Sequence, residues 1–203
     1  MTDDITSSRG RPIKRRFTQL LDALEKTHAR YAICGAVAVG AHGAERFTKD
    51  IDVLIADVDL ERAVAALARS MSEIGREPPE VGQRKQVRLR SKRAKGPQGV
   101  DIDLLVPVDA VEAWALATAV RGRAFGRKVD LVSSEALVLM KLRAYLSDPE
   151  SHRAGLHRSD AITLLKLGTA DVTVLRQFVR SHADLAAELE RALASPAPRG
   201  RLG

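Results

Sequence analysis

Two pairs of aspartates, each separated by one residue, stand beside apolar residues in the sequence. Asp50 and Asp52 lie in RFTKDIDVLI, residues 46–55, and Asp101 and Asp103 lie in VDIDLLVPV, residues 100–108. Side chains alternate between the two faces of a strand, so each pair of carboxylates shares one face and the apolar residues occupy the other. If the two strands pair, we expect the carboxylates to lie about 5 Å apart on one side of the ladder.

Carboxylates this close to one another need a strong counter-charge to stay ionised. A divalent cation supplies it, and oxygen-only ligands suit Mg²⁺ or Mn²⁺, which keep water ligands and accept substrate phosphates. Two such ions about 3.5–4 Å apart stabilise the attacking and leaving oxygens of a phosphoryl transfer. The pattern favours such a metal site over the alternative, a solvent-facing strand whose exposed side is acidic.

A third Asp-x-Asp, Asp57-Val-Asp59, has a structural explanation. It opens a predicted helix, where an N-cap at Asp59 and the helix dipole both favour carboxylates. We therefore assign it no catalytic role.

The elements that must position the aspartates alternate between helix and strand in the first part of the chain, and only helices follow. The fold class is therefore α/β (α+β), with a small mixed sheet flanked by helices and a helical C-terminal part. Periodicity and capping residues predict helices at 17–31, 36–43, 59–75, 110–120, 133–147, 158–167, 171–181 and 183–194, and strands at 31–34, 46–55, 86–92, 100–108 and 124–132.

The chain divides, on this pattern, into four parts. Residues 1–15 are predicted to be a flexible basic tail, 16–132 the core that holds the aspartates, 133–194 a helical region, and 195–203 a second flexible tail.

Composition and charge limit the class of protein and of partner. With 45% hydrophobic and 29% charged residues among 203, the chain is typical of a globular protein, and no apolar run approaches the length of a membrane span. Its N-terminus has no apolar signal segment and its single cysteine, Cys34, forms no internal disulfide, so we expect a cytoplasmic protein with no membrane partner. The net charge of +7 favours a polyanionic partner such as RNA or a nucleotide.

Residues 31–55, YAICGAVAVGAHGAERFTKDIDVLI, resemble the N-terminal signature of the nucleotidyltransferase (DNA polymerase beta-like) superfamily. Within it they are most similar to the bacterial AbiEii toxin-like and related minimal proteins. The signature is a strand, a Gly-Gly or Gly-Ser turn that opens a helix, and Arg-x-Thr-x-Asp-x-Asp on the next strand, with a third Asp on a later strand. The match covers roughly residues 30–106, with weaker similarity to about residue 168.

The resemblance implies the nucleotidyltransferase fold and a role for each matching residue. Asp50 and Asp52 would bind the metals, Mg²⁺ or Mn²⁺, two ions in all. Asp103 matches the third carboxylate best, as metal ligand and general base for the acceptor hydroxyl, with Asp101 as the alternative.

The same resemblance implies a nucleotide-binding set. Gly35 would begin a turn that cradles phosphate, followed by Ala36 where the family usually has Gly or Ser. Arg46 and Thr48 would orient the metal-binding strand or touch the nucleotide.

Residues 136–150 resemble the family's helix that bears a phosphate-binding lysine, here Lys141. Because Lys141 lies on an otherwise apolar helix stripe, it must either extend to solvent or meet an anion. Residues 157–165 resemble a later Lys/Arg-x-x-Asp helix, matching at Asp160. The alternative there is a helix start, with Ser159 as the cap.

The segment RKQVRLRSKRAK, residues 84–95, holds seven basic residues and no acidic one. It leads into the strand of Asp101 and Asp103, so we expect it near the site. It is either a clamp for an RNA acceptor or triphosphate, or a solvated hairpin that protects a sheet edge.

The function that follows is the transfer of a nucleoside monophosphate from an NTP to an acceptor hydroxyl, with release of pyrophosphate. The candidate acceptors are RNA or tRNA, a protein and a small molecule, and the resemblance permits a toxin role with an antitoxin partner. The alternative is a non-catalytic module of the same fold that binds RNA or a protein through its basic surface.

Overall fold

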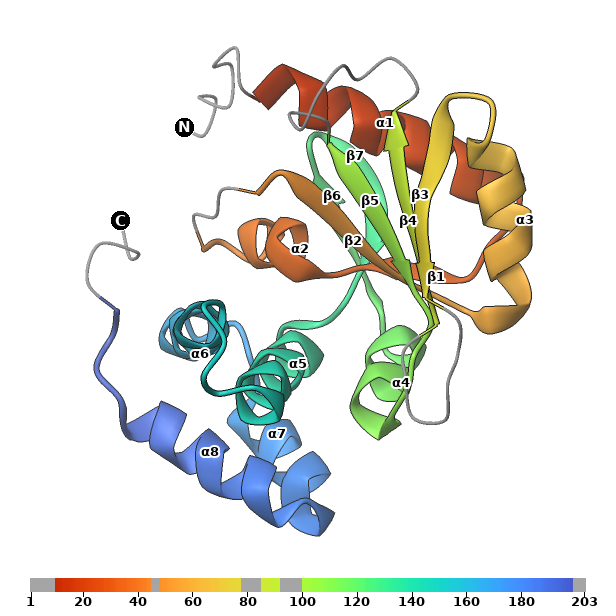
Figure 1. Ribbon diagram of the computed structural model, residues 1–203. Helices are drawn as coiled ribbons and strands as arrows, with labels where there is room; N and C mark the ends of the chain where they lie inside the picture. Colours follow the sequence, from red (N-terminus) through yellow and green to blue (C-terminus); the bar gives the residue numbers. More distant parts are fainter. Residues whose placement is uncertain (1–9, 45–47, 78–84, 92–99, 199–203) are drawn as a thin grey trace.

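The computed structural model describes residues 10–44, 48–77, 85–91 and 100–198. A mixed seven-stranded sheet runs through the molecule in the order β3-β4-β5-β2-β1-β7-β6 (Figure 1). The strands are β1 Tyr31–Ile33, β2 Asp50–Ile55, β3 Met71–Glu77, β4 Gln86–Ser91, β5 Asp101–Leu105, β6 Val120–Ala124 and β7 Arg127–Leu131. The predicted α/β class with a mixed sheet and a helical C-terminal part is confirmed.

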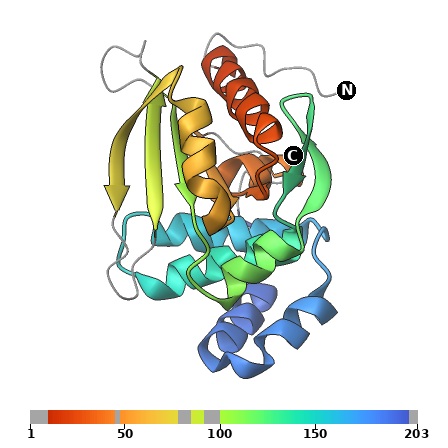
Figure 2. The ribbon, with the colours of Figure 1, turned by 90° about the vertical axis from the view of Figure 1, so that its right-hand side faces the viewer.

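Helices cover both faces of the sheet, as the two ribbon views show (Figures 1 and 2). One face packs against α1 (Gly10–Lys26) and α3 (Asp57–Leu67), which also contact each other. The core of the other face is built with α2 (Gly35–Ala41), α4 (Ala110–Ala117), α5 (Ser134–Ser147), α6 (Ala154–Lys166), α7 (Val172–Phe178) and α8 (Ala183–Ala194), and a short 3₁₀ turn, η1 (Val179–Ser181), joins the last two.

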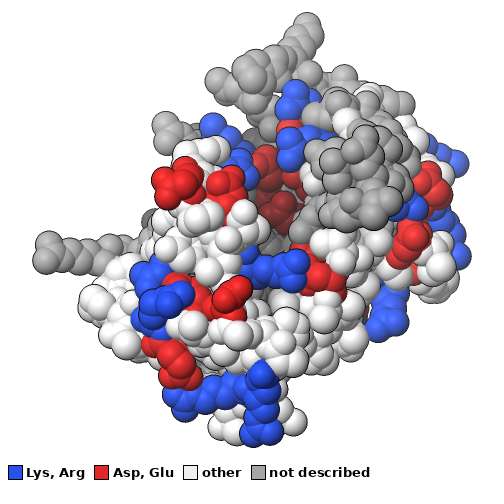
Figure 3. Space-filling view, turned by 60° about the horizontal axis from the view of Figure 1, so that its bottom comes forward, with Lys and Arg blue, Asp and Glu red and all other residues white. Residues whose placement is uncertain are grey.

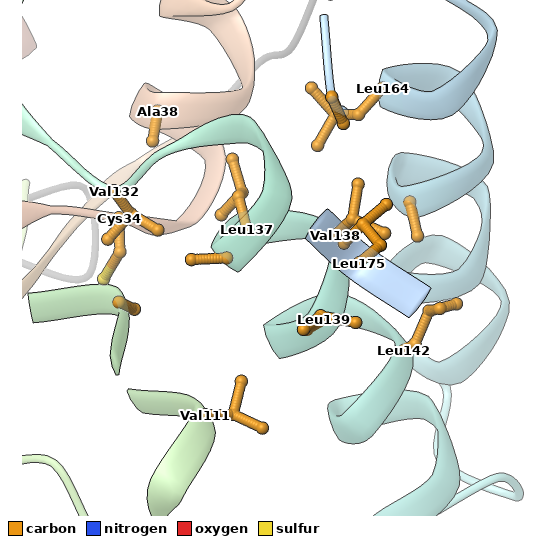
Figure 4. Close-up of a cluster of buried hydrophobic side chains, with 14 of the residues drawn as sticks. Cys34, Ala38, Val111, Val132, Leu137, Val138, Leu139, Leu142, Leu164 and Leu175 are labelled. Carbon is orange, nitrogen blue, oxygen red and sulfur yellow. The ribbon is translucent and has the colours of Figure 1, made fainter. Parts of the chain in front are cut away.

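Two hydrophobic cores follow from the alternation of side chains along the strands. On β2, Ile51 and Val53 point into the core beneath α1 and α3. Leu54 joins the opposite core, which is centred on α5 and includes Leu137 and Leu142 (Figure 4). The C-terminal helices are therefore packed onto the same sheet. The predicted division of the chain near residue 132 stays a prediction.

Most predicted elements are present, but the helix predicted at 59–75 is wrong. It ends at Leu67, and Met71–Glu77 forms edge strand β3, which pairs antiparallel with β4. Residues 71–77 hold two large apolar residues, Met71 and Ile74, too few to set a helical or a strand period. Pairing with β4 decides the structure here. Asp59 is not the N-cap either. That position is Ala56, and the Asp59 carboxylate accepts a hydrogen bond from the Arg30 N–H at 2.8 Å and pairs with Arg62.

Two further boundaries differ from the sequence prediction. The strand predicted at 124–132 is present as β7, but it is the second strand of a hairpin, because β6 precedes it at Val120–Ala124 and pairs with it. The turn residues Phe125 and Gly126 have φ of 49° and 82°. Positive φ at both positions suits the right-handed twist of the flanking strands, although Phe-Gly is not the usual turn sequence. Helix α1 begins at Gly10 rather than Phe17, so residues 10–15 belong to a helix and not to the predicted tail.

Among the described residues, no helix combines the length and the apolar character needed to cross a bilayer.

The packing of α1 yields a stability prediction. Phe17 is 0% exposed and meets the Phe125 ring edge-on at 5.0 Å. We expect Phe17→Ala to lower the free energy of unfolding by about 3–5 kcal/mol, measured by urea denaturation. The control, Val58→Ala, truncates a side chain that is 89% exposed, so it should change stability by less than about 0.5 kcal/mol. Equal effects of the two changes would contradict the described packing.

Candidate active site

The four aspartates lie opposite one another on two neighbouring strands. Strands β2 and β5 are parallel, with Asp50 opposite Asp101 and Asp52 opposite Asp103. Their intervening residues Ile51, Val53, Ile102 and Leu104 are buried in the core on the α1 and α3 side. The predicted pairing of the two strands is confirmed, and all four carboxylates stand on the other face of the sheet.

Strand β4 adds two arginines to the same face. Arg88 lies opposite Asp103 and donates to both of its carboxylate oxygens, at 2.7 and 2.8 Å. Arg90 does the same to Asp101, at 2.7 and 2.6 Å. The three strands β4, β5 and β2 thus carry two adjacent rows, Arg88–Asp103–Asp52 and Arg90–Asp101–Asp50.

These arginine pairs are only partly anticipated by the sequence. The sequence predicts that the basic segment 84–95 lies near the aspartates, either as a clamp or as a hairpin that protects a sheet edge. Strand β4 is internal, since β3 forms the edge. The missed signal is the alternation in QVRLR, which places Arg88 and Arg90 on one face of a strand that must pair with β5. Residues 92–99 lie outside the described residues.

Burial and neighbouring carboxylates both raise the pKa values of the β2 aspartates. Burial, and next the Asp103 carboxylate, raise the pKa of Asp52 from its ordinary 3.8 to about 6, against the opposing charges of Lys141 and Arg153. Burial and then Asp103 and Asp101 also raise the pKa of Asp50. Both carboxyl groups would ionise more readily if a further cation lay beside them.

A glycine is required where the chain leaves β1, because the Asp52 carboxylate lies directly against it. Gly35 has φ of +59°, and a Cβ on it would come 1.9 Å from Oδ2 of Asp52. The amide of Cys34 donates to the Asp52 carbonyl at 2.9 Å, which holds β1 and β2 together at this point. The predicted glycine turn therefore meets the predicted metal-binding strand at Asp52, and Ala36 follows, buried in the first turn of α2.

Thr48 stabilises the start of β2. Its hydroxyl donates to the Asp50 carbonyl at 2.9 Å and accepts from the Asp50 amide at 3.1 Å. These bonds suit the strand-orienting role that the sequence resemblance implies for Thr48, and that role stays a prediction. Arg46, predicted to share that role, lies outside the described residues.

Lys141 is buried rather than extended to solvent. Its ammonium group lies 3.1 Å from Oδ2 of Asp160, with the two side chains 9% and 1% exposed. Asp160 stands in the middle of α6, which begins at Ala154, so the alternative of a helix start at Ser159 is wrong. The Lys141 charge also acts on Asp52, which connects α5 and α6 to the acidic face.

The donor chemistry of this face suits a divalent cation. Among the described residues it offers carboxylate oxygens, which Mg²⁺ and Mn²⁺ prefer, and burial followed by neighbouring carboxylates raises the pKa of Asp50 and of Asp52. Acidic side chains are recessed in a hollow with basic side chains beside it (Figure 3). Within the described residues, however, no three His, Cys, Asp or Glu side chains are gathered as a metal-binding group. Asp101 and Asp103 instead turn both oxygens to arginines.

The sequence matches one protein family over most of its length. A family profile described as nucleotidyl transferase AbiEii toxin, type IV TA system, matches residues 19–199. No curated protein matches the sequence.

Solved structures share the fold at low sequence identity. The antibiotic-resistance factor ANT(2'')-Ia, solved in complex with adenylyl-2''-tobramycin, is 18% identical, with a TM-score of 0.58 over 84% of this chain and 98% of that one. An antigenic nucleotidyltransferase-like protein from Paracoccidioides brasiliensis is 21% identical, with a TM-score of 0.52 over 88% of this chain and 92% of the other. These likenesses show that the predicted nucleotidyltransferase fold is correct.

The contact between Gly35 and Asp52 predicts an unequal response of two glycines in one helix. Gly35→Ala forces a Cβ into the Asp52 carboxylate and a left-handed conformation that costs alanine about 1–2 kcal/mol, so we expect at least that loss in the free energy of unfolding. Gly40→Ala is the matched control. It has nothing within 4 Å of its added Cβ and gains up to about 1 kcal/mol of helix propensity. Urea denaturation of both variants tests the prediction, and equal stabilities would contradict it.

The raised pKa of Asp52 predicts a pH dependence of stability. The folded state holds the Asp52 proton more tightly than the unfolded state, so this carboxyl favours folding below about pH 4, and the benefit is lost as pH rises to about 6. Asp52→Asn removes the titration. Relative to wild type, we expect the variant to gain about 1–3 kcal/mol of stability between pH 4 and pH 7, measured by denaturation in EDTA. A constant difference across that range would contradict the assignment.

Proposed function

This chain belongs to the AbiEii family of nucleotidyl transferase toxins, and on that premise we propose the reaction that its acidic face performs. The chain is a nucleotidyltransferase. We infer that it moves a nucleoside monophosphate from an NTP to an acceptor hydroxyl and releases pyrophosphate. The observation that carries this proposal is the in-register pairing of Asp50 with Asp101 and Asp52 with Asp103 on one face of the sheet.

Asp50 and Asp52 are the proposed metal ligands. Both project from the first half of β2, and both have raised pKa values, which a cation would lower. Bound Mg²⁺ or Mn²⁺, two ions as in two-metal phosphoryl-transfer sites, would neutralise charge on the transferring phosphoryl group. In the same proposal Gly35 leaves room for the Asp52 carboxylate, and Thr48 fixes the backbone of Asp50.

Asp103 is the proposed third carboxylate and general base, in preference to Asp101. It lies opposite Asp52, and after burial it is the largest influence on the pKa of both Asp50 and Asp52, whereas Asp101 ranks behind Asp103 in raising the pKa of Asp50. A base in this position would take the proton of the acceptor hydroxyl as that oxygen attacks the α-phosphorus. Asp101 would then support the metal site from the neighbouring row.

The nucleotide would lie between the acidic face and the helices on that side. The turn of Gly35 and Ala36 reaches Asp52 from one side, and the buried Lys141 acts on Asp52 from α5. Lys141 is a compact charge held by Asp160, which suits a contact to a phosphate oxygen. Arg46 completes the proposed nucleotide-binding set on the sequence match alone.

The acceptor and the partners rest on family membership and charge. The family description names a type IV toxin–antitoxin system, so we propose a toxin with a cognate antitoxin. Among the acceptor classes, RNA or tRNA, a protein hydroxyl or a small molecule, the net charge of +7 favours RNA.

One observation favours a second candidate, a non-catalytic module that binds RNA or protein through its basic surface. Asp101 and Asp103 are bonded by both oxygens to Arg90 and Arg88. If those pairs were permanent, the third carboxylate would be lost to catalysis. Salt-sensitive RNA binding with no effect of an NTP on the melting temperature would identify the module.

Asp52→Asn tests the catalytic proposal. Incubation with each α-labelled NTP plus total RNA or cell protein should label an acceptor with the wild type, while the variant loses at least about 10³-fold in rate and remains folded. The matched control is Asp57→Asn, which removes an exposed carboxylate from the third Asp-x-Asp and should keep wild-type turnover. Equal labelling by wild type and Asp52→Asn would refute the assignment.

A further inference from the structure

We propose that Arg88 competes with the divalent cation for Asp103, so that this arginine sets the metal affinity of the site and leaves Asp103 when the metal binds. The inference rests on the proposed function, because it concerns the carboxylates assigned there to the metal. It makes Arg88 a positioning residue that acts through Asp103.

Arg88 and a divalent cation would bind the same atoms, the two carboxylate oxygens of Asp103. Arg88 uses Nε and one terminal nitrogen to hold both oxygens of Asp103, at 2.7 and 2.8 Å. A bidentate guanidinium occupies one lone pair on each carboxylate oxygen and places a positive charge beside them, so it opposes a second cation, Mg²⁺ or Mn²⁺, at the same oxygens. Each oxygen of Asp103 is thus engaged by β4, across the ladder that sets Arg88 opposite Asp103.

The two partners differ in how freely they can leave the pair. The Arg88 side chain is 47% exposed, whereas that of Asp103 is 6% exposed. The guanidinium can therefore turn into solvent at little desolvation cost, but Asp103 cannot lose its partner without another cation, since Asp50 and Asp52 lie beside it. The arrangement therefore favours replacement of the Arg88 guanidinium by a metal cation over an Asp103 carboxylate with no cation beside it.

Arg90 and Asp101 provide a comparison within the same sheet. The pair has the same bidentate geometry, one row away. Asp101 lies opposite Asp50, at the first residue of each strand, while Asp103 lies opposite Asp52 and acts electrostatically on both β2 aspartates. Loss of Arg90 should therefore matter less to the metal than loss of Arg88.

Binding of Mn²⁺ alone to the full chain tests the competition, by titration calorimetry or by the EPR signal of free Mn²⁺ at pH 7.5. We expect Arg88→Gln to lower the Mn²⁺ Kd by roughly tenfold, within the usual range for coupling between two ligands. Arg88→Lys, which keeps the charge but not the fork, should give a smaller decrease, and Arg90→Gln the smallest. Thermal melting of each variant establishes that it is folded.

A second measurement uses the unmutated protein, so the test survives if Arg88→Gln does not fold. In NMR spectra, the Nε–H resonance of Arg88 is assigned by its loss in Arg88→Lys. When Mg²⁺ is added, which is diamagnetic and so stands in for Mn²⁺, this resonance should shift and its proton should exchange faster with water. The Arg90 resonance should change less. An Arg88 resonance that stays unchanged at saturating Mg²⁺ would overturn the proposal.

The outcomes separate this inference from the proposed function. One outcome would overturn the competition but leave the metal site intact. In it, Asp52→Asn abolishes Mn²⁺ binding, while Arg88→Gln leaves the Mn²⁺ affinity unchanged or weakens it. Arg88 would then only support Asp103. No Mn²⁺ binding by any folded variant would instead contradict the proposed metal-dependent transfer.

Discussion

The structure depends on one electrostatic constraint, which is that four carboxylates must share the face of two neighbouring strands. Strands β2 and β5 bury apolar residues on one side, and the period of two then forces Asp50, Asp52, Asp101 and Asp103 together on the other. Two arginines of β4 neutralise the β5 pair, while the β2 pair keeps raised pKa values. Stability alone does not explain this arrangement, since an unbalanced buried charge opposes folding.

The surrounding elements are arranged to hold that charge in place. Gly35 gives the Asp52 carboxylate space that any side chain would fill, and Thr48 fixes the backbone before Asp50. From the helical side, α5 and α6 bring the buried Lys141–Asp160 pair, whose lysine acts on Asp52. The sheet, the glycine turn and the C-terminal helices therefore meet at one acidic face, and we propose that the nucleotidyl transfer of this AbiEii family member takes place there.

Much of this was predictable from local patterns. The alternation around Asp50 and Asp101 predicts both strands and their shared polar face. Local patterns do not predict contacts between residues that are distant in the sequence. Met71–Glu77 is a strand because β4 lies beside it, and Arg88 and Arg90 meet Asp103 and Asp101 because the β4–β5 register places them opposite. The burial of Lys141 likewise depends on a residue 19 positions away, Asp160.

The most direct test of the central claim is an anomalous difference map from crystals of the protein grown with Mn²⁺ and a non-hydrolysable NTP analogue. The expected result is anomalous density among the carboxylates of Asp50, Asp52 and Asp103, with the triphosphate on the side of Gly35 and Lys141. Ordered Mn²⁺–nucleotide bound elsewhere, with no density on the β2–β5 face, would contradict the claim that this face is the catalytic centre.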